Sequence, residues 1–442
     1  MVTQKSLQQL QTLALHFYRY VNNNDGRNPT TILELFNDLD AIDAPIKNVS
    51  DQQIIDILIA GCKSLTLDHE AFPAFCKFMF KACAKQIRLT SLRSSQFEVC
   101  IIFLLDGLEQ TGTTAELRVD MLRALSALVF ENASNASKYY PRVSNLLLGL
   151  ADRSTRPLEV RRMAINCIGN SCANAGSKLQ SYYPSYYQAL LSNVCVITHG
   201  SHGTMMVASS SLDFTDSAVR KVASSTLRAL QFVLSQDKTL VTNPLCDIIQ
   251  IVHKFIFTSV STQAYNAMMR EDTTPLQVAT TTSRIRMARF QQQQQQQITS
   301  KRSSHISWRS TEPRIIGLAS SDSELSDTGD TTMANPRRQR DDAKIRINAL
   351  LCLSAIAKTS PRVLYPHWPK FIPDTFSIFL GNNTDQHDHL YPTLQSDNQP
   401  LSLFTLLLYD PTLTVRTAVC NTLIAMLDGS KQYLSVASER LA

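Results

Sequence analysis

Residues 410–429 read DPTLTVRTAVCNTLIAMLDG, and this stretch describes one bounded helical unit. Its aliphatic residues recur at spacings of three and four, which places them on one face of a helix. Asp410 is a favoured N-cap residue, Pro411 suits the first helical position, and Gly429 suits the position after the last turn. The stretch therefore predicts an amphipathic helix of about five turns that begins after Asp410 and ends at Gly429.

The same pattern opens with an arginine at five places in the chain. Each arginine follows an aliphatic residue, and the residues three and seven positions later are small or aliphatic. The five are Arg118, Arg161, Arg220, Arg346 and Arg416. An amphipathic helix of this kind cannot bury its apolar face alone, and it is typical of repeats that stack side by side. The repetition therefore predicts an all-α solenoid.

These helices resemble HEAT repeats, in which the second helix begins with Asp-Pro followed by Val-Arg. The spacing between the first two arginines also fits one HEAT repeat of about 40–47 residues. A closer resemblance, to the HEAT repeat-containing protein six family, lies in residues 320–327 (SSDSELSD), 364–374 (LYPHWPKFIPD) and 428–437 (DGSKQYLSVA). The resemblance implies a HEAT/armadillo-type α-solenoid with no established catalytic activity. Because family members are usually longer, it also implies that the chain corresponds to their N-terminal portion.

Composition changes divide the chain into segments. Residues 261–342 contain threonine runs, a run of glutamines at 291–297, and clusters of serine with arginine or aspartate. Such a segment cannot bury enough apolar surface to offset its ordering entropy, so we predict a long disordered insert. The predicted division is 1–150 for N-terminal helical repeats, 151–260 for HEAT-type repeats, 261–342 for the insert, and 343–442 for HEAT-type repeats that continue the array.

Composition favours a packed helical protein without catalysis. Hydrophobic residues make up 44% of the chain and there are 13 glycines, and no glycine-rich phosphate-binding motif is present. The first twenty residues are amphipathic and do not resemble a signal peptide, and cysteines occur in separate apolar stretches. We therefore expect a protein that is cytoplasmic, nuclear or both, with no enzymatic activity, no cofactor, no small-molecule substrate and no membrane association.

The excess positive charge is confined to one segment. The formal net charge is +6, and the basic residues between 284 and 314 account for it. The helical remainder is close to balanced, which argues against a nucleic-acid partner.

The five arginines have two readings, a row that contacts a ligand or a structural ladder. We favour the ladder, because stability in a solenoid depends on contacts between neighbouring repeats. In such a ladder the arginine pairs with an aspartate in the turn or in the neighbouring repeat, and three of the five arginines have an aspartate a few residues before them. These local pairs are Asp410 with Arg416, Asp341 or Asp342 with Arg346, and Asp216 with Arg220.

Several other residues are weaker candidates for chemistry. His199 with His202, and His387 with His389, have spacings that a metal could use, but both pairs lie in polar stretches without a matching cysteine or carboxylate pattern. No serine, cysteine or threonine lies in a nucleophile motif. We therefore expect no metal site and no catalytic site.

Serines in the insert are the most specific functional signal. Ser321 has Glu324 three residues later, which suits an acid-directed kinase, and Arg302 precedes Ser303, which suits a basic-directed kinase. The opposing reading is that serine-rich tracts contain such matches by chance. The candidate phosphosites are Ser303, Ser321, Ser323 and Ser326.

The sequence thus favours a protein-interaction scaffold that binds other proteins along an extended solenoid surface and is regulated by phosphorylation in the insert. The alternatives are a nuclear-transport-type receptor and a nucleic-acid-associated solenoid. Trp308 and Trp368 are the only tryptophans, which argues against an armadillo receptor that binds basic peptides through repeated tryptophans.

Overall fold

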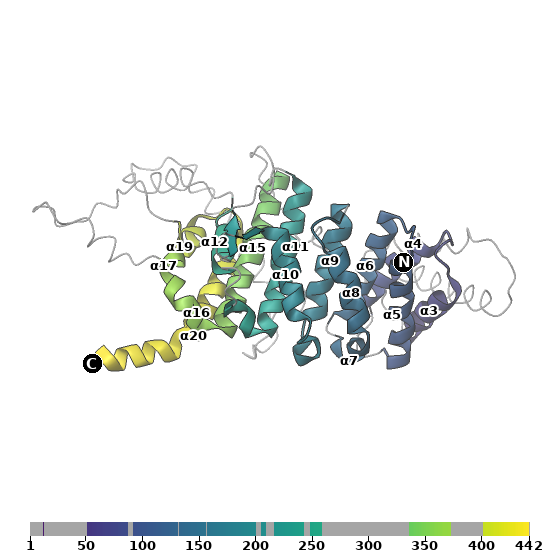
Figure 1. Ribbon diagram of the computed structural model, residues 1–442, viewed down its shortest axis with the longest axis horizontal. Helices are drawn as coiled ribbons and strands as arrows, with labels where there is room; N and C mark the ends of the chain where they lie inside the picture. Colours follow the sequence, from purple (N-terminus) through teal and green to yellow (C-terminus); the bar gives the residue numbers. More distant parts are fainter. Residues whose placement is uncertain are drawn as a thin grey trace, which may run out of the picture.

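Helices stacked side by side form an elongated body (Figure 1). The computed structural model describes residues 51–86, 92–130, 132–155, 157–199, 205–208, 216–242, 248–258, 336–372 and 401–441, together with Thr12. Almost all of these residues are helical. The prediction of an all-α solenoid is therefore confirmed, with the addition of one short β-hairpin.

The longer helices form two rows. The first row contains α3 (Asp51–Ser64), α5 (Ser94–Glu109), α8 (Tyr140–Leu150), α10 (Tyr183–Val194), α12 (Ile248–Ile256) and α19 (Leu403–Tyr409). The second row contains α4 (Phe72–Lys81), α6 (Ala115–Val129), α9 (Leu158–Cys172), α11 (Ser217–Gln236), α15 (Pro336–Thr359) and α20 (Leu413–Leu441). From α5 onwards each first-row helix packs on the second-row helix that follows it, and successive second-row helices pack on one another. This arrangement is that of a helical-repeat solenoid.

Short helical turns connect the rows. They are the π-helical turn η1 (Ala82–Gln86), the helices α7 (Ala133–Ala136), α16 (Pro361–Leu364) and α17 (Trp368–Phe371), and the 3₁₀ turns η3 (Ser137–Tyr139), η4 (Gly176–Leu179), η5 (Lys238–Thr242) and η6 (Tyr365–His367). The connections keep consecutive helices adjacent, as short links in helical arrays do.

Local sequence determines where several helices begin. Thr114 Oγ1 accepts a hydrogen bond from the Leu117 amide at the start of α6, and Asp216 Oδ1 accepts one from the Ala218 amide at the start of α11. Helices α4, α8 and α10 carry a proline in the first turn, where a backbone donor would have no helical partner. The starts of these five helices therefore follow from side-chain capping and from proline in the first turn.

One apolar core runs through the stack between the two rows. It contains the aliphatic stripes that the sequence predicted, such as Ile54, Leu58, Leu104 and Leu125, all at most 1% exposed. The cysteines of α4, α5 and α9 are free thiols buried in this core, where they pack as small hydrophobic groups. Each repeat thus contributes to a core that no repeat could form by itself.

A β-hairpin lies between α10 and α11. Strand β1 (Val196–His199) pairs antiparallel with β2 (Met205–Ala208), and Val196 is opposite Ala208. The sequence indicated a polar stretch around His199 and no strand. The strands VITH and MMVA are too short to give a clear alternating pattern of apolar and polar residues. Their sequences therefore do not distinguish them from a loop.

Two predicted helix boundaries were wrong. Helix α20 begins at Leu413 and continues through Gly429 to Leu441, so Gly429 does not end it. Helix α15 begins at Pro336, so residues 336–342 are helical and do not belong to a disordered insert. Asp341 and Asp342 are buried by their neighbours in the stack, and this tertiary burial is what a compositional boundary misses. The rest of the predicted insert, 261–335, lies outside the described residues.

Candidate interaction surface

The five repeat arginines lie on second-row helices, four of them in the first turn and Arg346 near the middle of its helix. Their positions are Arg118 in α6, Arg161 in α9, Arg220 in α11, Arg346 in α15 and Arg416 in α20. In every case the Nε atom is buried. Arg161, Arg220 and Arg346 are buried as whole residues and Arg118 and Arg416 are half-buried, so the five do not form a fully exposed row for a ligand.

The aspartates of the next repeat lie against two of these arginines. Arg346 Nε is 3.0 Å from Asp410 Oδ2, with both side chains buried, although the pair is not aligned as a hydrogen bond. Arg220 Nε is 3.9 Å from carboxylate oxygens of both Asp341 and Asp342. The charge pairs of Arg220 and Arg346 thus join neighbouring repeats, which is one of the two pairings that a structural ladder allows.

Asp410 has a second role beside its ion pair. Its Oδ1 accepts a hydrogen bond from the Thr412 amide at 2.9 Å, one residue before α20 begins. The single carboxylate therefore supports the start of α20 and its attachment to α15 together. Asp216 remains an N-cap of its own helix, as its sequence position allows.

Polar side chains join the middles of the second-row helices. Asn170 Nδ2 donates to Ser126 Oγ at 2.7 Å, from α9 to α6. Asn348 Nδ2 donates to Ser224 Oγ at 2.9 Å, from α15 to α11. Further along the row, Thr422 Oγ1 donates to the Leu350 carbonyl at 3.1 Å, from α20 to α15. Each of these bonds joins two second-row helices. We call the residues that make them, together with Arg228, the polar ladder: Ser126, Asn170, Ser224, Asn348, Leu350 and Thr422.

Arg228 completes the polar ladder between α9 and α11. Its Nη2 donates to Asn170 Oδ1 at 3.0 Å, and its guanidinium lies 5.5 Å from the centre of the Phe232 ring. Burial lowers the pKa of Arg228 to about 10, so the side chain still carries its charge near neutral pH. No repeat motif in the sequence marks these residues. Asparagines inside otherwise apolar helix faces were the signal that could have found them.

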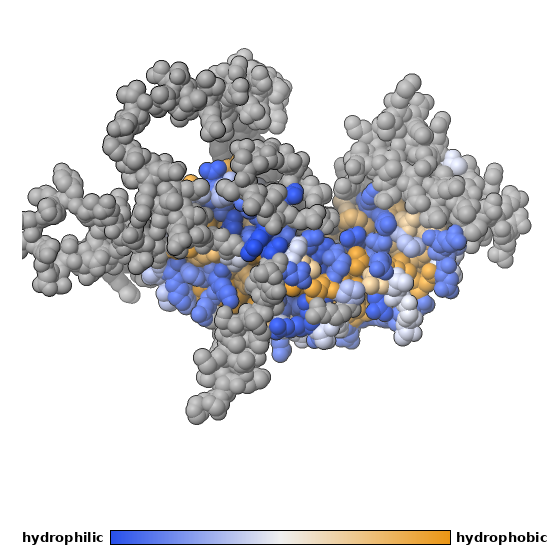
Figure 2. Space-filling view, turned by 90° about the horizontal axis from the view of Figure 1, so that it is seen from above, coloured by the Kyte–Doolittle hydropathy of each residue, from blue (hydrophilic) through white to orange (hydrophobic). Residues whose placement is uncertain are grey.

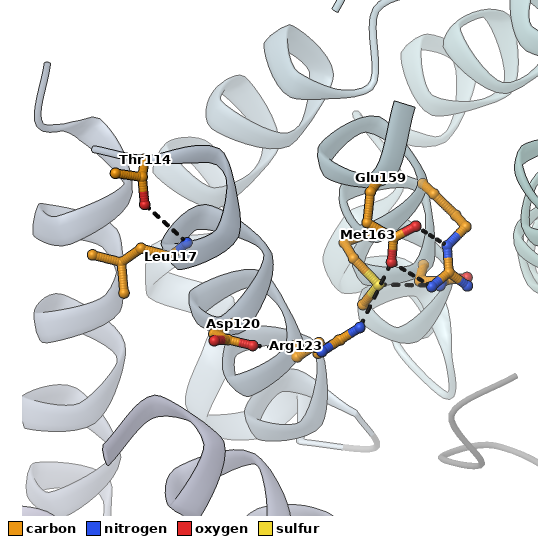
Figure 3. Close-up of polar contacts among 8 residues, drawn as sticks. Thr114, Leu117, Asp120, Arg123, Glu159 and Met163 are labelled. Atoms are coloured by element: carbon orange, nitrogen blue, oxygen red, sulfur yellow. Dashed lines mark hydrogen bonds and ion pairs between the residues drawn. The ribbon is translucent and has the colours of Figure 1, made fainter. Parts of the chain in front are cut away.

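A charged cluster covers α6 and α9 at the surface (Figure 3). Glu159 accepts from Arg162 at 2.8 Å and 2.6 Å, which makes a bidentate pair with a buried guanidinium. Arg123 lies 3.6 Å from Glu159 and 3.5 Å from Asp120. The Arg123 and Glu159 side chains are 35% and 43% exposed, so this cluster is both ordered and accessible.

The first row carries a separate charged group. Arg142 on α8 contacts Asp106 and Glu109 on α5 at 2.6 Å and 2.5 Å. The hydrogen bond from Arg142 lowers the pKa of Glu109, although both groups remain near solvent. Seen from above, the visible helical body shows hydrophilic residues interspersed with smaller hydrophobic patches (Figure 2). Surfaces of mixed charge thus occur on both rows.

The remaining candidate residues give no site. His199 ends strand β1, whereas His202, His387 and His389 lie outside the described residues, as do Ser303, Ser321, Ser323 and Ser326. Over the part of the chain that is described, no three His, Cys, Asp or Glu side chains gather as metal ligands would. No described helix combines the length and the apolarity that crossing a bilayer requires.

Comparison with known proteins gives a family model but no function. Residues 344–442 match the model of a domain of unknown function (DUF4042). A putative uncharacterized protein from Dictyostelium discoideum is 26% identical over 355 residues, a match that covers 73% of this chain and 20% of that protein. The chain thus spans about a fifth of the length of this relative. Yeast importin-beta is similar in structure with a TM-score of 0.33 and 12% identity, over 98% of this chain and 46% of importin-beta.

Proposed function

We propose that the chain is a non-enzymatic scaffold that binds other proteins across its second-row helices. The observation that carries the proposal is the charged cluster of Asp120, Arg123, Glu159 and Arg162. Buried Arg162 holds Glu159 in place, so the exposed part of the cluster does not have to be ordered when a partner binds. Preorganised charge lowers the entropic cost of association.

The polar ladder supports the same proposal. Because Asn170 and Asn348 each bond to the preceding second-row helix, the helices keep a fixed spacing. A partner that spans several repeats would then meet a surface of constant geometry, and each repeat would contribute a modest share of the affinity. Charges of both signs in the cluster fit a protein partner better than a polyanion, which would need a basic surface.

The test is affinity purification of tagged full-length chain from cells, followed by mass spectrometry. The variant Arg123→Glu reverses the charge on α6, and the matched control Arg142→Glu makes the same change on α8 at similar exposure, 36% against 35%. We expect specific partners to be lost with Arg123→Glu and kept with Arg142→Glu. Equal recovery with both variants, or nucleic acid as the main co-purified component, would contradict the proposal.

The insert is the proposed regulatory element. Deletion of residues 261–335, which leaves α15 intact, should keep the partners that bind the helical body and remove any that bind the insert. We propose phosphorylation at Ser303, Ser321, Ser323 and Ser326, since acidic or basic residues flank these serines. Treatment of purified chain with an acid-directed kinase checks this, and a mass spectrum without phosphate between residues 303 and 326 would exclude it.

We also propose membership of the HEAT repeat-containing protein six family, with a division into 1–150, 151–260, an insert that ends at residue 335, and repeats that resume at the start of α15. Residues 364–374 and 428–437 support that membership. With it we propose a cytoplasmic or nuclear location, which fluorescence microscopy of tagged chain would test.

A further inference from the structure

Exposed bases recur where three consecutive second-row helices end. Lys178 lies in η4, which follows α9, and Lys238 begins η5, which follows α11. Lys358 lies in the last turn of α15, and Arg362 lies in α16, which follows it. All four residues are exposed. We call Lys178, Lys238, Lys358 and Arg362 the basic edge.

Hydrogen bonds join the turns that carry the basic edge. The Gly176 amide donates to Gln236 Oε1 at 3.0 Å, which links the turn after α9 to the end of α11. Ser360 Oγ donates to the Lys238 carbonyl at 3.4 Å, which links the turn after α15 to η5. Because each turn contacts the next, the bases follow one another along a single edge of the stack.

The turn after α6 continues this edge but differs in charge. Lys178 Nζ donates to Ser134 Oγ at 3.2 Å, so this turn lies beside η4. Its own base, Lys138 in η3, pairs with Glu98 at 3.0 Å. Figure 1 shows α7 and α16, which begin the first and the last of these turns, toward the lower side of the body. The positive charge of the edge is therefore partly compensated at Lys138 and begins in full at Lys178.

Acidic side chains do not balance the basic edge at its surface. In the three turns that carry it, Asp237 is the acidic residue that the structure describes. It is buried, and its carboxylate accepts hydrogen bonds from Gln180 Nε2 at 3.0 Å and Thr239 Oγ1 at 2.7 Å. The charge of Asp237 is therefore engaged in holding the turns together, and it leaves the exposed bases free to meet a partner.

The connections at the other ends of the same helices have mixed charge. Those that precede α9, α11 and α20 contain Asp152, Arg153, Asp216 and Asp410. A succession of exposed bases is therefore a property of one edge of the stack and not of its turns in general.

The spacing of the basic edge indicates the chemistry of a partner. Packed helices lie about 8–10 Å apart, so a base in each repeat recurs at about that distance. An extended peptide advances about 3.3–3.6 Å per residue, so three residues span about the same distance. Duplex DNA carries one charge per about 1.7 Å of its axis, which is far denser than one base per repeat. The basic edge thus fits an extended peptide that has an acid at every third position.

We propose that the basic edge binds an extended acidic segment of a partner protein, with one carboxylate beside the base of each repeat. Exposed ion pairs are weak one at a time, so the affinity comes from several repeats engaged together and falls as the salt concentration rises. The basic edge shares no residue with the charged cluster on α6 and α9. The inference therefore goes beyond the proposed function, and either one can fail alone.

The test uses the purified full chain and two fluorescein-labelled synthetic peptides of the same composition. One peptide has glutamate at every third position, and in the other the glutamates are contiguous. Fluorescence anisotropy measures the affinity, and lysine acetylation read by peptide mass spectrometry locates the contact. The test variant combines Lys178→Glu with Lys238→Glu. The matched control combines Lys63→Glu with Lys77→Glu, which changes the net charge equally at exposed positions on α3 and α4.

We expect the spaced peptide to bind the test variant about tenfold or more weakly than the wild-type chain, and the control variant within about twofold of it. The spaced peptide should bind the wild-type chain more tightly than the contiguous one, and it should protect Lys178 and Lys238 from acetylation but not Lys77. The milder pair Lys178→Gln with Lys238→Gln should give an intermediate loss at an unchanged melting temperature, which separates charge from folding.

Three results would overturn the proposal. They are equal losses in the test and control variants, equal affinity of the two peptides, and acetylation of Lys178 and Lys238 that the spaced peptide does not slow. Tighter binding of a labelled single strand of DNA, lost in the test variant, would also overturn it, because a nucleic acid would then be the occupant.

Discussion

A single carboxylate holds two repeats together at Asp410. It pairs with Arg346 across the α15–α20 contact and accepts the Thr412 amide, and its side chain is 0% exposed. Removal of one partner of a buried ion pair leaves the other charge buried without compensation. This loss costs more stability than the loss of a surface ion pair. The residue therefore matters for the attachment of the whole last repeat.

We predict that Asp410→Asn lowers the free energy of unfolding by about 3–5 kcal/mol, because it keeps the amide acceptor but removes the charge that faces Arg346. Asp216→Asn is the matched control, since Asp216 is an exposed N-cap and asparagine caps equally well. Urea unfolding followed by circular dichroism measures both. Equal losses in the two variants would show that the ion pair contributes nothing.

His253 gives the contact between α12 and α17 a dependence on pH. Its Nε2 lies 3.2 Å from the Lys370 carbonyl, and its ring contacts those of Phe257 and Phe371. Burial, with a smaller contribution from the charge of Lys370, lowers the pKa of His253 below its ordinary value of 6.5. The folded state therefore favours the neutral ring, and unfolding lets it take up a proton.

The stability that this histidine contributes is complete above its unfolded pKa and is lost as the pH falls through 6.5 toward the lower folded value. We predict that lowering the pH from about 7.5 to about 5.5 reduces the melting temperature of the wild-type chain more than that of His253→Gln. Differential scanning fluorimetry across this range measures the difference. Parallel curves for the two proteins would assign the pH dependence to other groups.

At the scale of elements, α9 and α11 approach each other closely at Gly169. A Cβ added at Gly169 would lie 2.9 Å from the Ala229 Cα and 3.1 Å from its Cβ. Backbone cannot move aside as the end of a flexible side chain can, so the two helices would have to separate. Gly149 on α8 is a contrasting case, because a Cβ there would meet nothing within 4 Å.

We predict that Gly169→Ala destabilises the chain by about 1–3 kcal/mol through overpacking. Gly149→Ala should instead stabilise it by about 0.5–1 kcal/mol, because alanine loses less conformational entropy in a helix. Chemical denaturation of both variants shows whether the free energy of unfolding falls in the first and rises in the second. A stabilised Gly169→Ala protein would mean that α9 and α11 adjust more freely than their contact indicates.

Sequence predicted the elements better than it predicted their contacts. The arginine pattern identified five of the six second-row helices, because the periodicity of one helix is local information. The Arg346–Asp410 pair joins residues of different repeats, so only the stacking brings them together. The start of α15 also depends on a contact between repeats that local sequence does not predict. Burial of Asp341 against α11 extends the helix into a segment of polar composition.

A repeated signal was present in the first row as well. Tyr140-Pro141 begins α8 and Tyr183-Pro184 begins α10, and both tyrosines are fully buried. A search for arginines alone does not find this second pattern. The β-hairpin, in contrast, had no adequate signal, since four residues in each strand are too few for a period of two.

At the scale of the whole molecule, stability is distributed along a row of neighbours. Each internal second-row helix packs between two others, whereas α20 packs on α15 alone among the second-row helices. In such an array the free energy of opening a repeat is roughly its own stability plus that of its interfaces. The repeats at the two ends of the described array, each with one second-row interface, should therefore open more easily than the internal repeats.

We predict that backbone amides of residues 413–428 in α20 exchange with deuterium about tenfold faster, or more, than those of α9, which has neighbours on both sides. Hydrogen exchange with mass spectrometry on the full chain resolves the two helices. Exchange of both at one common rate would show that the array unfolds as a single cooperative unit.

The contact at Gly169 also bears on how the body bends. Where two helices meet backbone to backbone, rotation at that point meets steric repulsion within a short distance. The joint between α9 and α11 should therefore bend less readily than a joint at which only flexible side chains meet.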